Sequence, residues 1–555
     1  MALNLPTASR RIKRLAAILA ILGAYAGVTT LLAQRYAAVP EDREHRIEIR
    51  GDWFFRNGEK FLVKGVGYDP TRPGELPWAR HHSSALLESD FARIRAAGFN
   101  TIRTWEALSR DELDEAQRQG LAVIQGIWID PDGHFSDPQF QRESSEKVTR
   151  MVRGARRSPA ILAYLIMNEP KPGRVLTEGV EPTRAFIRSL AAAVRDLDPG
   201  VPIGFASWPG LEFLDEPSLD FAAVNLYPFR PAVLREAIGY EGMVRLWKER
   251  LAPTRPLLIT EYGISVSPMA PKVNDPGGAT EAQQAAELPK LADGLMKGGA
   301  AGGSVFMWID GWWKNNDVPH DEMTHDSSDG EEWFGLVAMD NLSDVLGRPR
   351  PALAAMEAWN RTVLTLPTDG DVAAREVEFE AAVTDPGEIT VELALNEEPP
   401  VLLPTARYGM WVRGRLGLLA HARGPQRAEF TLIGPRGVIA RFERTLIPPG
   451  EAPVLALTAS GGGEPRTVTV KAVTTDGRPL TNAPVRLAVT EASHRYDQFF
   501  QRTTDKEGMI ALPVYLPEAP NELQVVAGLP AAAADADAAN SLAVISILIE
   551  AKKTP

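Results

Sequence analysis

Apolar runs alternate with amphipathic stretches along the chain from about residue 50 to residue 360. "LLESDFARIRAAG" places Leu87, Phe91 and Ile94 on one helical face and ends at Gly98, after which "FNTIRTW" follows as a strand. The unit recurs at once, with a short helix in "DELDEAQRQG" before the apolar strand "LAVIQGIWID". Eight apolar strands are predicted in this way, at 61–67, 99–105, 121–128, 160–168, 201–207, 221–227, 256–261 and 303–309.

Continuous apolar strands that alternate with helices predict a parallel sheet that is covered on both faces. Eight such units within about 310 residues are typical of a (β/α)8 TIM barrel, which we assign to residues 45–366. A doubly wound open sheet is the alternative, but no glycine-rich phosphate-binding loop follows the first strand. In a barrel the active site lies where strands end, so a polar residue that closes an apolar strand is a candidate functional residue.

The pattern changes after the barrel region. Short runs of alternating apolar and polar residues appear there between Gly, Pro and Asp turns. We expect a β module over 372–450 and an immunoglobulin-like β-sandwich over 451–555, with a low-complexity linker or loop at 528–540. These modules could bind glycan or brace the barrel. Bracing is favoured because their sequences show no aromatic platform.

The N-terminal segment, residues 1–40, predicts a membrane anchor. The basic stretch "SRRIKR" precedes residues 15–33, which carry no charge and approach the roughly 20 residues needed to cross a bilayer. The basic flank predicts a single-pass protein with its barrel on the extracytoplasmic, periplasmic side. A cleaved signal peptide is the alternative, since Ala24 and Ala26 offer a cleavage site, and the protein would then be secreted.

The amino-acid composition limits the binding partners and catalytic groups that the protein can have. The 555 residues carry a net charge of −12 without a dominant block of one sign, which argues against a nucleic-acid partner. There is no cysteine, so disulfides, thiolate metal sites and cysteine nucleophiles are excluded. His320 and His325 lie in an acidic loop at 315–333, but their spacing fits no zinc or EF-hand pattern. We therefore predict neither a metal nor a cofactor, and the oligomeric state stays open.

Two glutamates close predicted strands. Glu169 ends "AYLIMNE" on the fourth strand, and Glu261 ends "PLLITE" on the seventh. Two carboxyl groups on one barrel mouth are the minimum equipment for cleaving a glycosidic bond. Arg103 could hold Glu261 ionised and Tyr227 could donate a hydrogen bond to it, while Asn168 could bind the hydroxyl beside the anomeric carbon.

Tryptophan is concentrated at the predicted strand ends and in the eighth loop: Trp105, Trp128, Trp208, Trp308, Trp312, Trp313 and Trp333. Apolar sugar faces stack on aromatic rings, so this distribution favours a mouth lined with sugar subsites. We select Trp105, Trp128 and Trp308 as substrate-binding candidates, beside the alternative that such residues only pack loops onto the barrel.

These motifs together resemble the retaining glycoside hydrolases of clan A. The resemblance covers roughly residues 50 to 360 and rests on "NGEKFLVKGVGYDP", "NTIRTW", "NEP", "NLYPF", "TEYG" and "VFMWIDGWW". It extends to the β-galactosidase and β-mannosidase, endoglucanase and β-1,3-glucanosyltransferase families, although strand six lacks a His-x-Tyr pair. It implies a β-linked glycan as substrate, β-glucan being favoured, with Glu169 as acid/base and Glu261 as nucleophile. A transglycosylase with the same residues and an inactive glycan-binding barrel at the membrane are the alternatives.

Overall fold

The computed structural model describes most of the chain after residue 46. The described ranges are 47–78, 83–269, 273–314, 322–372, 376–417, 425–448, 453–460, 466–491, 494–515, 521–530 and 539–549. The predicted membrane segment 15–33 lies outside these ranges, as does His320. No helix within them is long and apolar enough to span a bilayer. Residues His45–Pro555 form one compact unit.

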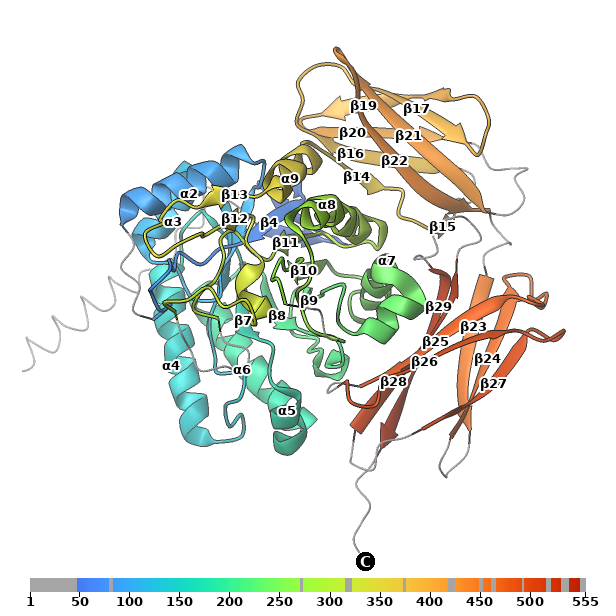
Figure 1. Cartoon of the computed structure of the whole chain (residues 1–555), viewed down its shortest axis with the longest axis horizontal. Helices are drawn as coiled ribbons and strands as arrows, with labels where there is room; N and C mark the ends of the chain where they lie inside the picture. The colour runs from blue at the N-terminus through green and yellow to red at the C-terminus, as the bar shows by residue number, and fades with distance from the viewer. Residues whose placement is uncertain are drawn as a thin grey trace, which may run out of the picture. The chain divides into compact units, whose positions relative to one another are not determined.

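Eight parallel strands close into a barrel, which confirms the predicted fold (Figure 1). Neighbouring strands in the chain are neighbours in the sheet, and the last strand closes on the first with Gly302 opposite Val63. The strands are β4 (Val63–Gly67), β5 (Thr101–Arg103), β6 (Ala122–Gly126), β7 (Ile161–Asn168), β8 (Ile203–Ser207), β9 (Ala222–Asn225), β10 (Leu257–Tyr262) and β11 (Gly302–Val305).

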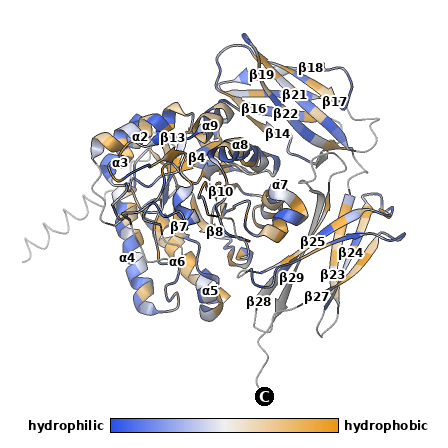
Figure 2. Ribbon diagram, in the orientation of Figure 1, coloured by the Kyte–Doolittle hydropathy of each residue, from blue (hydrophilic) through white to orange (hydrophobic). Residues whose placement is uncertain are grey.

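The connecting helices surround the barrel. They are α2 (Ser84–Ala96), α3 (Arg110–Arg118), α4 (Pro138–Ala155), α5 (Pro172–Glu178), α6 (Val180–Leu197), α7 (Ala232–Leu251), α8 (Glu281–Lys297) and α9 (Pro351–Arg361). Leu87, Phe91 and Ile94 of α2 are buried as their spacing predicts. Gly98 ends this helix region with a φ of 79°, a conformation that costs glycine least. In Figure 2 these helices carry both polar and apolar residues, as amphipathic helices do.

A small antiparallel sheet precedes the barrel and covers its N-terminal end. It consists of β1 (Ile47–Arg50), β2 (Trp53–Arg56) and β3 (Glu59–Phe61). Phe54 of β2 is fully buried, and its ring meets that of Phe221, which precedes β9, edge-on at 5.2 Å. With this end closed by apolar side chains, the opposite rim, where the strands end, is left for a binding site.

Two β-sandwiches follow the barrel. In the first, the sheet β14 (Thr362–Leu366), β16 (Val377–Val383), β20 (Trp411–Leu416) and β19 (Thr405–Tyr408) faces the sheet β15 (Asp371–Val372), β22 (Gly437–Ile447), β21 (Gln426–Gly434), β17 (Thr390–Leu395) and β18 (Val401–Leu403). Phe379 and Phe430 meet between them at 5.5 Å in a shared apolar core. This sandwich starts with β14, within the range that the sequence assigns to the barrel.

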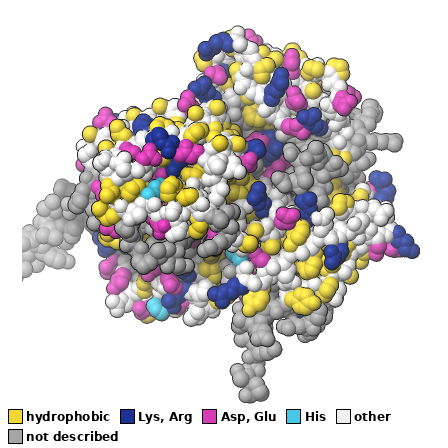
Figure 3. All heavy atoms as spheres, in the orientation of Figure 1, with side chains coloured by type: hydrophobic (Ala, Val, Ile, Leu, Met, Phe, Trp, Pro, Cys, Tyr) yellow, Lys and Arg dark blue, Asp and Glu magenta, His cyan; other side chains and the backbone are white. Residues whose placement is uncertain are grey.

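The second sandwich has sheets of three and four strands. They are β23 (Pro453–Ser460), β24 (Arg466–Thr474) and β27 (Met509–Val514), then β26 (Gln498–Thr503), β25 (Pro484–Thr490), β28 (Asn521–Pro530) and β29 (Ala539–Ile549). Val470 and Leu487 belong to their common core. β28 and β29 pair with each other, so both ends of the low-complexity segment belong to strands. Figure 3 shows acidic and basic side chains interspersed on the visible face, without a field of one sign.

Candidate active site

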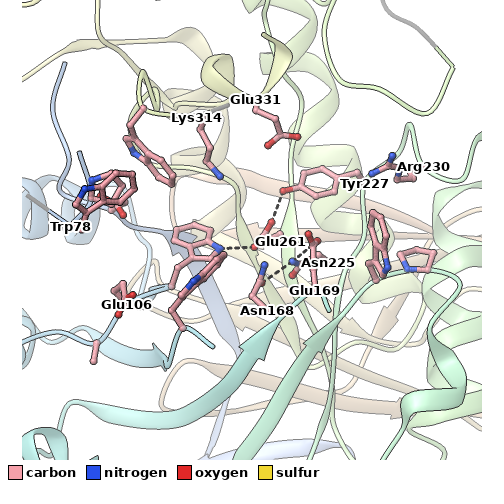
Figure 4. A pocket seen from close by; sticks show the side chains of 18 of the residues that line it. Trp78, Glu106, Asn168, Glu169, Asn225, Tyr227, Arg230, Glu261, Lys314 and Glu331 are labelled. Carbon is pink, nitrogen blue, oxygen red and sulfur yellow. Dashed lines mark hydrogen bonds between the residues drawn. The ribbon is translucent and has the colours of Figure 1, made fainter. Parts of the chain in front are cut away.

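The C-terminal ends of the barrel strands bring the predicted polar residues to one rim. Arg103 ends β5, Asn168 ends β7 with Glu169 directly after it, and Glu261 lies near the end of β10. A pocket of about 640 Å³ opens there (Figure 4). Its lining comprises Asp69, Pro77, Trp78, Trp105, Glu106, Ala107, Trp128, Asn168, Glu169, Trp208, Pro209, Asn225, Tyr227, Phe229, Arg230, Glu261, Trp313, Lys314 and Glu331.

Three side chains hold the Glu261 carboxylate. Trp105 Nε1 donates a hydrogen bond to Oε1 at 2.9 Å, and the Tyr227 hydroxyl donates one to Oε2 at 2.7 Å. Arg103 Nη1 lies 2.8 Å from Oε1, and this guanidinium is 1% exposed. Burial and then the nearby Glu261 charge raise the pKa of Tyr227, so its phenol keeps the proton that it donates. One cation and two hydrogen-bond donors therefore complement negative charge on the Glu261 carboxylate.

The Glu169 carboxyl has a different environment. Asn225 Nδ2 donates to its Oε1 at 2.8 Å. Burial first, and then the charge of Glu261, raise the pKa of Glu169 to about 7, while the Asn225 hydrogen bond opposes the shift. Part of this side chain still opens into the pocket. Glu169 can therefore carry a proton near neutral pH and deliver it to a bound molecule.

The backbone around Glu169 adopts uncommon conformations. Met167 and Glu169 have positive φ angles of 124° and 45°. Non-glycine residues rarely occupy this region, and such strain persists where the surrounding structure enforces it, often at functional sites. The Glu169 N–H donates to the Ala206 carbonyl of the next strand at 2.9 Å, which fixes the residue beside β8.

Asn168 and Asn225 belong to one hydrogen-bond network beneath the pocket. Asn168 Oδ1 accepts from Arg103 Nη2 at 2.6 Å and from Asn225 Nδ2 at 3.2 Å. Thr260 donates to Asn225 Oδ1 at 2.7 Å, which fixes the orientation of that amide. Because the Asn168 oxygen accepts both bonds, its N–H2 group is left to donate to a ligand hydroxyl.

The tryptophans divide into two groups. Trp105 and Trp128 line the pocket, together with Trp78, Trp208 and Trp313. Trp308 does not join them, because its side chain is fully buried, so a sugar contact of Trp308 has no support in this geometry.

The physical reason lies at the end of β11, the strand that Trp308 follows. This strand stops at Val305, so strand alternation does not extend as far as Trp308. Phe306 is directed toward the site instead, with its ring centroid 5.4 Å from that of Trp105 and 6.0 Å from that of Tyr227.

Lys314 and Glu331 are pocket residues that sequence reasoning missed. Figure 4 shows both side chains directed toward the space above Glu261. The Lys314 ammonium lies 4.6 Å from the ring centre of Phe306 and 4.9 Å from that of Trp313. Burial raises the pKa of Glu331, and the Lys314 charge opposes this shift. Glu331 lies in the acidic loop noted at 315–333, but the sequence of this loop does not single it out.

The described residues contain no group of three or more His, Asp or Glu side chains that could hold a metal ion. His325 is instead a packing residue. Its ring lies between those of Trp312 and Trp333, with centroid distances of 5.0 Å and 3.4 Å. Burial lowers the pKa of His325 to about 4, so the imidazole is neutral at physiological pH.

Comparison with known proteins relates the barrel to a described protein family. Residues 47–297 match the family described as "Glycosyl hydrolases family 2, TIM barrel domain". The barrel is thus similar to a clan A glycoside hydrolase domain. This match confirms the resemblance that the strand-end motifs indicate.

The named relatives share little sequence identity with this chain. The chain is 21% identical over 254 residues to "pH-responsive protein 1" of Candida albicans, which covers 40% of this chain and 45% of that protein. It is 23% identical over 463 residues to "Beta-galactosidase 2" of Enterobacter cloacae, which covers 76% and 40%. The apo structure of Bacteroides uniformis β-glucuronidase 3 aligns with a TM-score of 0.44 and 14% identity, over 91% of this chain and 65% of that one. The chain thus spans less than half the length of these two curated relatives.

Proposed function

We propose that the protein is a retaining β-glycosidase with Glu261 as nucleophile and Glu169 as acid/base. The observation that carries this proposal is the contrast between the two carboxyl groups. Glu261 is surrounded by an arginine and two donors, which complement negative charge on its carboxylate. Glu169 has its pKa raised to about 7, which favours the protonated form. Double displacement needs one group of each kind.

The two steps follow from these roles. In the first, Glu261 attacks the anomeric carbon and forms a glycosyl ester while Glu169 gives its proton to the departing glycosidic oxygen. In the second, Glu169 takes a proton from water, and the oxygen of that water displaces Glu261 from the anomeric carbon. The amide of Asn168 is suited to donate to the hydroxyl next to that carbon, where hydrogen bonds strengthen in the transition state.

We propose a β-linked oligo- or polysaccharide as the substrate, with β-glucan favoured. Five tryptophans line the pocket, which suits sugar rings that present flat apolar faces. Because a relative is named a β-galactosidase, β-galactosides belong in the same substrate panel. The same aromatic lining would also hold an acceptor sugar, so transglycosylation is the second candidate. Product analysis separates the two, because only transglycosylation makes longer glycans.

We also propose that the barrel is exported and stays attached through residues 15–33. The basic flank and the uncharged run support this topology. Cell fractionation and sequencing of the mature N-terminus test it. A chain that begins near residue 27 would replace the anchor with a cleaved signal peptide, and a cytosolic barrel would contradict export.

Covalent labelling tests the proposed mechanism. A 2-deoxy-2-fluoro-β-glucosyl fluoride should form the ester quickly and hydrolyse it slowly, so the glycosyl protein accumulates. We expect peptide mass spectrometry to place the label on Glu261. Glu181→Ala is a matched control, because the Glu181 side chain is 73% exposed and does not line the pocket. This control should label normally, whereas Glu261→Ala should not. A label on another residue, or hydrolysis with inversion, would contradict the proposal.

A further inference from the structure

The loop after β8 carries a tryptophan beside the proposed acid. Glu169 is bonded through its backbone to Ala206 of β8, and Trp208 follows two residues later in the pocket lining. Glu169 protonates the oxygen that leaves with the departing sugar. Trp208 is therefore placed on the leaving-group side of the pocket, where its indole can stack on that sugar.

The second β-sandwich contacts this loop at two points. The His494 ring, in the turn between β25 and β26, meets the Trp208 indole edge-on, with centroids 6.3 Å apart and planes at 72°. Gln524 of β28 donates to the Glu212 carboxylate in the same loop. Glu212 in turn accepts from the Gly210 N–H at 2.9 Å. A module more than 250 residues downstream thus fastens the segment that carries Trp208.

A contact on the pocket side also holds the Trp208 indole in place. The guanidinium of Arg230, a pocket residue, lies 4.8 Å from the centre of the indole. The ring is therefore held between a cation from the barrel and an imidazole from the sandwich. Such contacts restrict the ring to one orientation before any ligand arrives, which lowers the entropic cost of binding.

His494 is built into its turn and is not a surface histidine. Its side chain is 4% exposed, and its Nδ1 lies 3.2 Å from Thr490 Oγ1 and 3.5 Å from an Asp497 carboxylate oxygen. The residue adopts a φ of 56°, and the neighbouring Glu491 carboxylate accepts from the Arg495 N–H at 2.6 Å. A strained, buried polar residue of this kind needs a reason beyond its own stability.

Unsatisfied polar atoms at the junction support the same conclusion. In the described part of the chain, His494 Nε2, Trp208 Nε1 and both Asp497 carboxylate oxygens are buried without a hydrogen-bond partner. An apolar contact would brace the two modules at lower cost. The arrangement is more readily understood as one that sets the position of the indole.

We propose that His494 is a positioning residue that holds Trp208 as the platform for the leaving-group sugar. The inference rests on the proposed glycosidase function and deepens it. The preferred substrate carries a further sugar on the side of Glu169, and the second β-sandwich shapes the subsite that binds it. This gives the C-terminal module a role in substrate binding through the barrel, without an aromatic platform of its own.

Two substrates separate this role from general bracing. A glucotriose, β-1,3- or β-1,4-linked, presents a sugar to Trp208, whereas β-glucosyl fluoride has a single atom as its leaving group. We expect His494→Ala to raise KM for the trisaccharide about threefold to tenfold, as for the loss of an aromatic contact, and to change KM for the fluoride less. His134→Ala is the matched control, because His134 is 67% exposed and does not line the pocket. It should change neither value.

A double-mutant cycle tests whether His494 acts through Trp208. Trp208→Ala should raise KM for the trisaccharide, and adding His494→Ala in that background should have little further effect. Additive losses, or equal losses on both substrates, would overturn the proposal and leave a merely structural contact. Thermal unfolding of each variant shows whether it is folded.

Fluorine NMR supplies a readout that does not need turnover. In protein labelled with 5-fluorotryptophan, the resonance missing from Trp208→Phe belongs to Trp208. We expect His494→Ala to shift this resonance, and the trisaccharide to perturb it in the unaltered protein more than in the variant. If the protein turns over no glycoside, the proposed function fails, yet this pattern would still support the platform. A Trp208 resonance that responds to neither change would overturn it.

Discussion

The ends of β7 and β10 place the same side chain on the same rim and surround it differently. Glu261 receives hydrogen bonds from Trp105 and Tyr227 and faces the Arg103 guanidinium. Glu169 accepts a hydrogen bond from Asn225, and burial raises its pKa to about 7. Since the residue type is identical, the neighbours assign the roles: two donors and a cation complement negative charge on Glu261, whereas desolvation and the nearby Glu261 charge favour the acid form of Glu169.

Removing the Glu261 carboxylate, near the end of β10, should have the largest effect on activity. Glu261→Ala should lower kcat by about 10⁵-fold or more on every substrate, because no other group can form the glycosyl ester. Steady-state assays with a β-linked trisaccharide and with β-glucosyl fluoride measure this loss. The exposed control Glu181→Ala should retain full activity. Substantial turnover by Glu261→Ala would mean that β10 does not carry the nucleophile.

Removing the acid should give a loss that depends on the substrate. Glu169→Ala should lower kcat/KM for an unactivated β-glycoside by about 10²-fold to 10⁴-fold, the usual contribution of a general acid. The first step with β-glucosyl fluoride should be spared, because fluoride leaves without a proton. Rapid-quench measurement of the first turnover separates the two cases. Equal losses on both substrates would show that the two ends do not differ in role.

The pH dependence should follow the proton of Glu169. Because its pKa is raised to about 7, kcat/KM for an unactivated β-glycoside should fall about tenfold per pH unit above that value, as the acid form is lost. With β-glucosyl fluoride, whose departure needs no proton, kcat/KM of the unaltered protein should lack this alkaline limb. An equal alkaline limb on both substrates would have to be assigned to another group.

Replacing the two glutamates should change the thermal stability of the protein in opposite directions. A carboxyl with a raised pKa stabilises the fold below its ordinary value of 4.5, and this contribution is lost as the pH rises through about 7. Glu169→Gln should therefore raise Tm at pH 8 and have less effect at pH 4. Glu261→Gln leaves the buried Arg103 without its anion and should cost about 3–5 kcal/mol. Thermal unfolding of both variants checks the signs, and a shared sign at pH 8 would contradict the account.

The sequence predicted the barrel because its signal is local. Each barrel strand overlaps a predicted apolar run, several of these strands end at polar residues, and α2 buries the face that its periodicity indicates. Glu169 and Glu261 could be selected for the same reason, since a strand end in a parallel barrel points to one rim. The sequence could then suggest which residues surround these two glutamates, but it could not give the distances between them.

Features that depend on loop conformation were not predictable. Trp308 follows β11 directly in sequence, yet it is buried while Phe306 approaches the site. Glu331 and Lys314 reach the pocket from a long loop without periodicity. The contact between Trp208 and His494 joins residues almost 300 positions apart, and nothing in either segment indicates the other.

Azide rescue of the two glutamate variants tests the assignment of roles most directly. Azide is a small nucleophile that needs no general base. With an activated β-glycoside, Glu169→Ala plus azide should give the β-glycosyl azide, because azide displaces Glu261 from the ester. Glu261→Ala plus azide should give the α-glycosyl azide, because azide then attacks in place of the missing carboxylate. Products of the opposite configuration would exchange the two roles. No rescue of either variant, with both folded and able to bind glycan, would contradict the catalytic account.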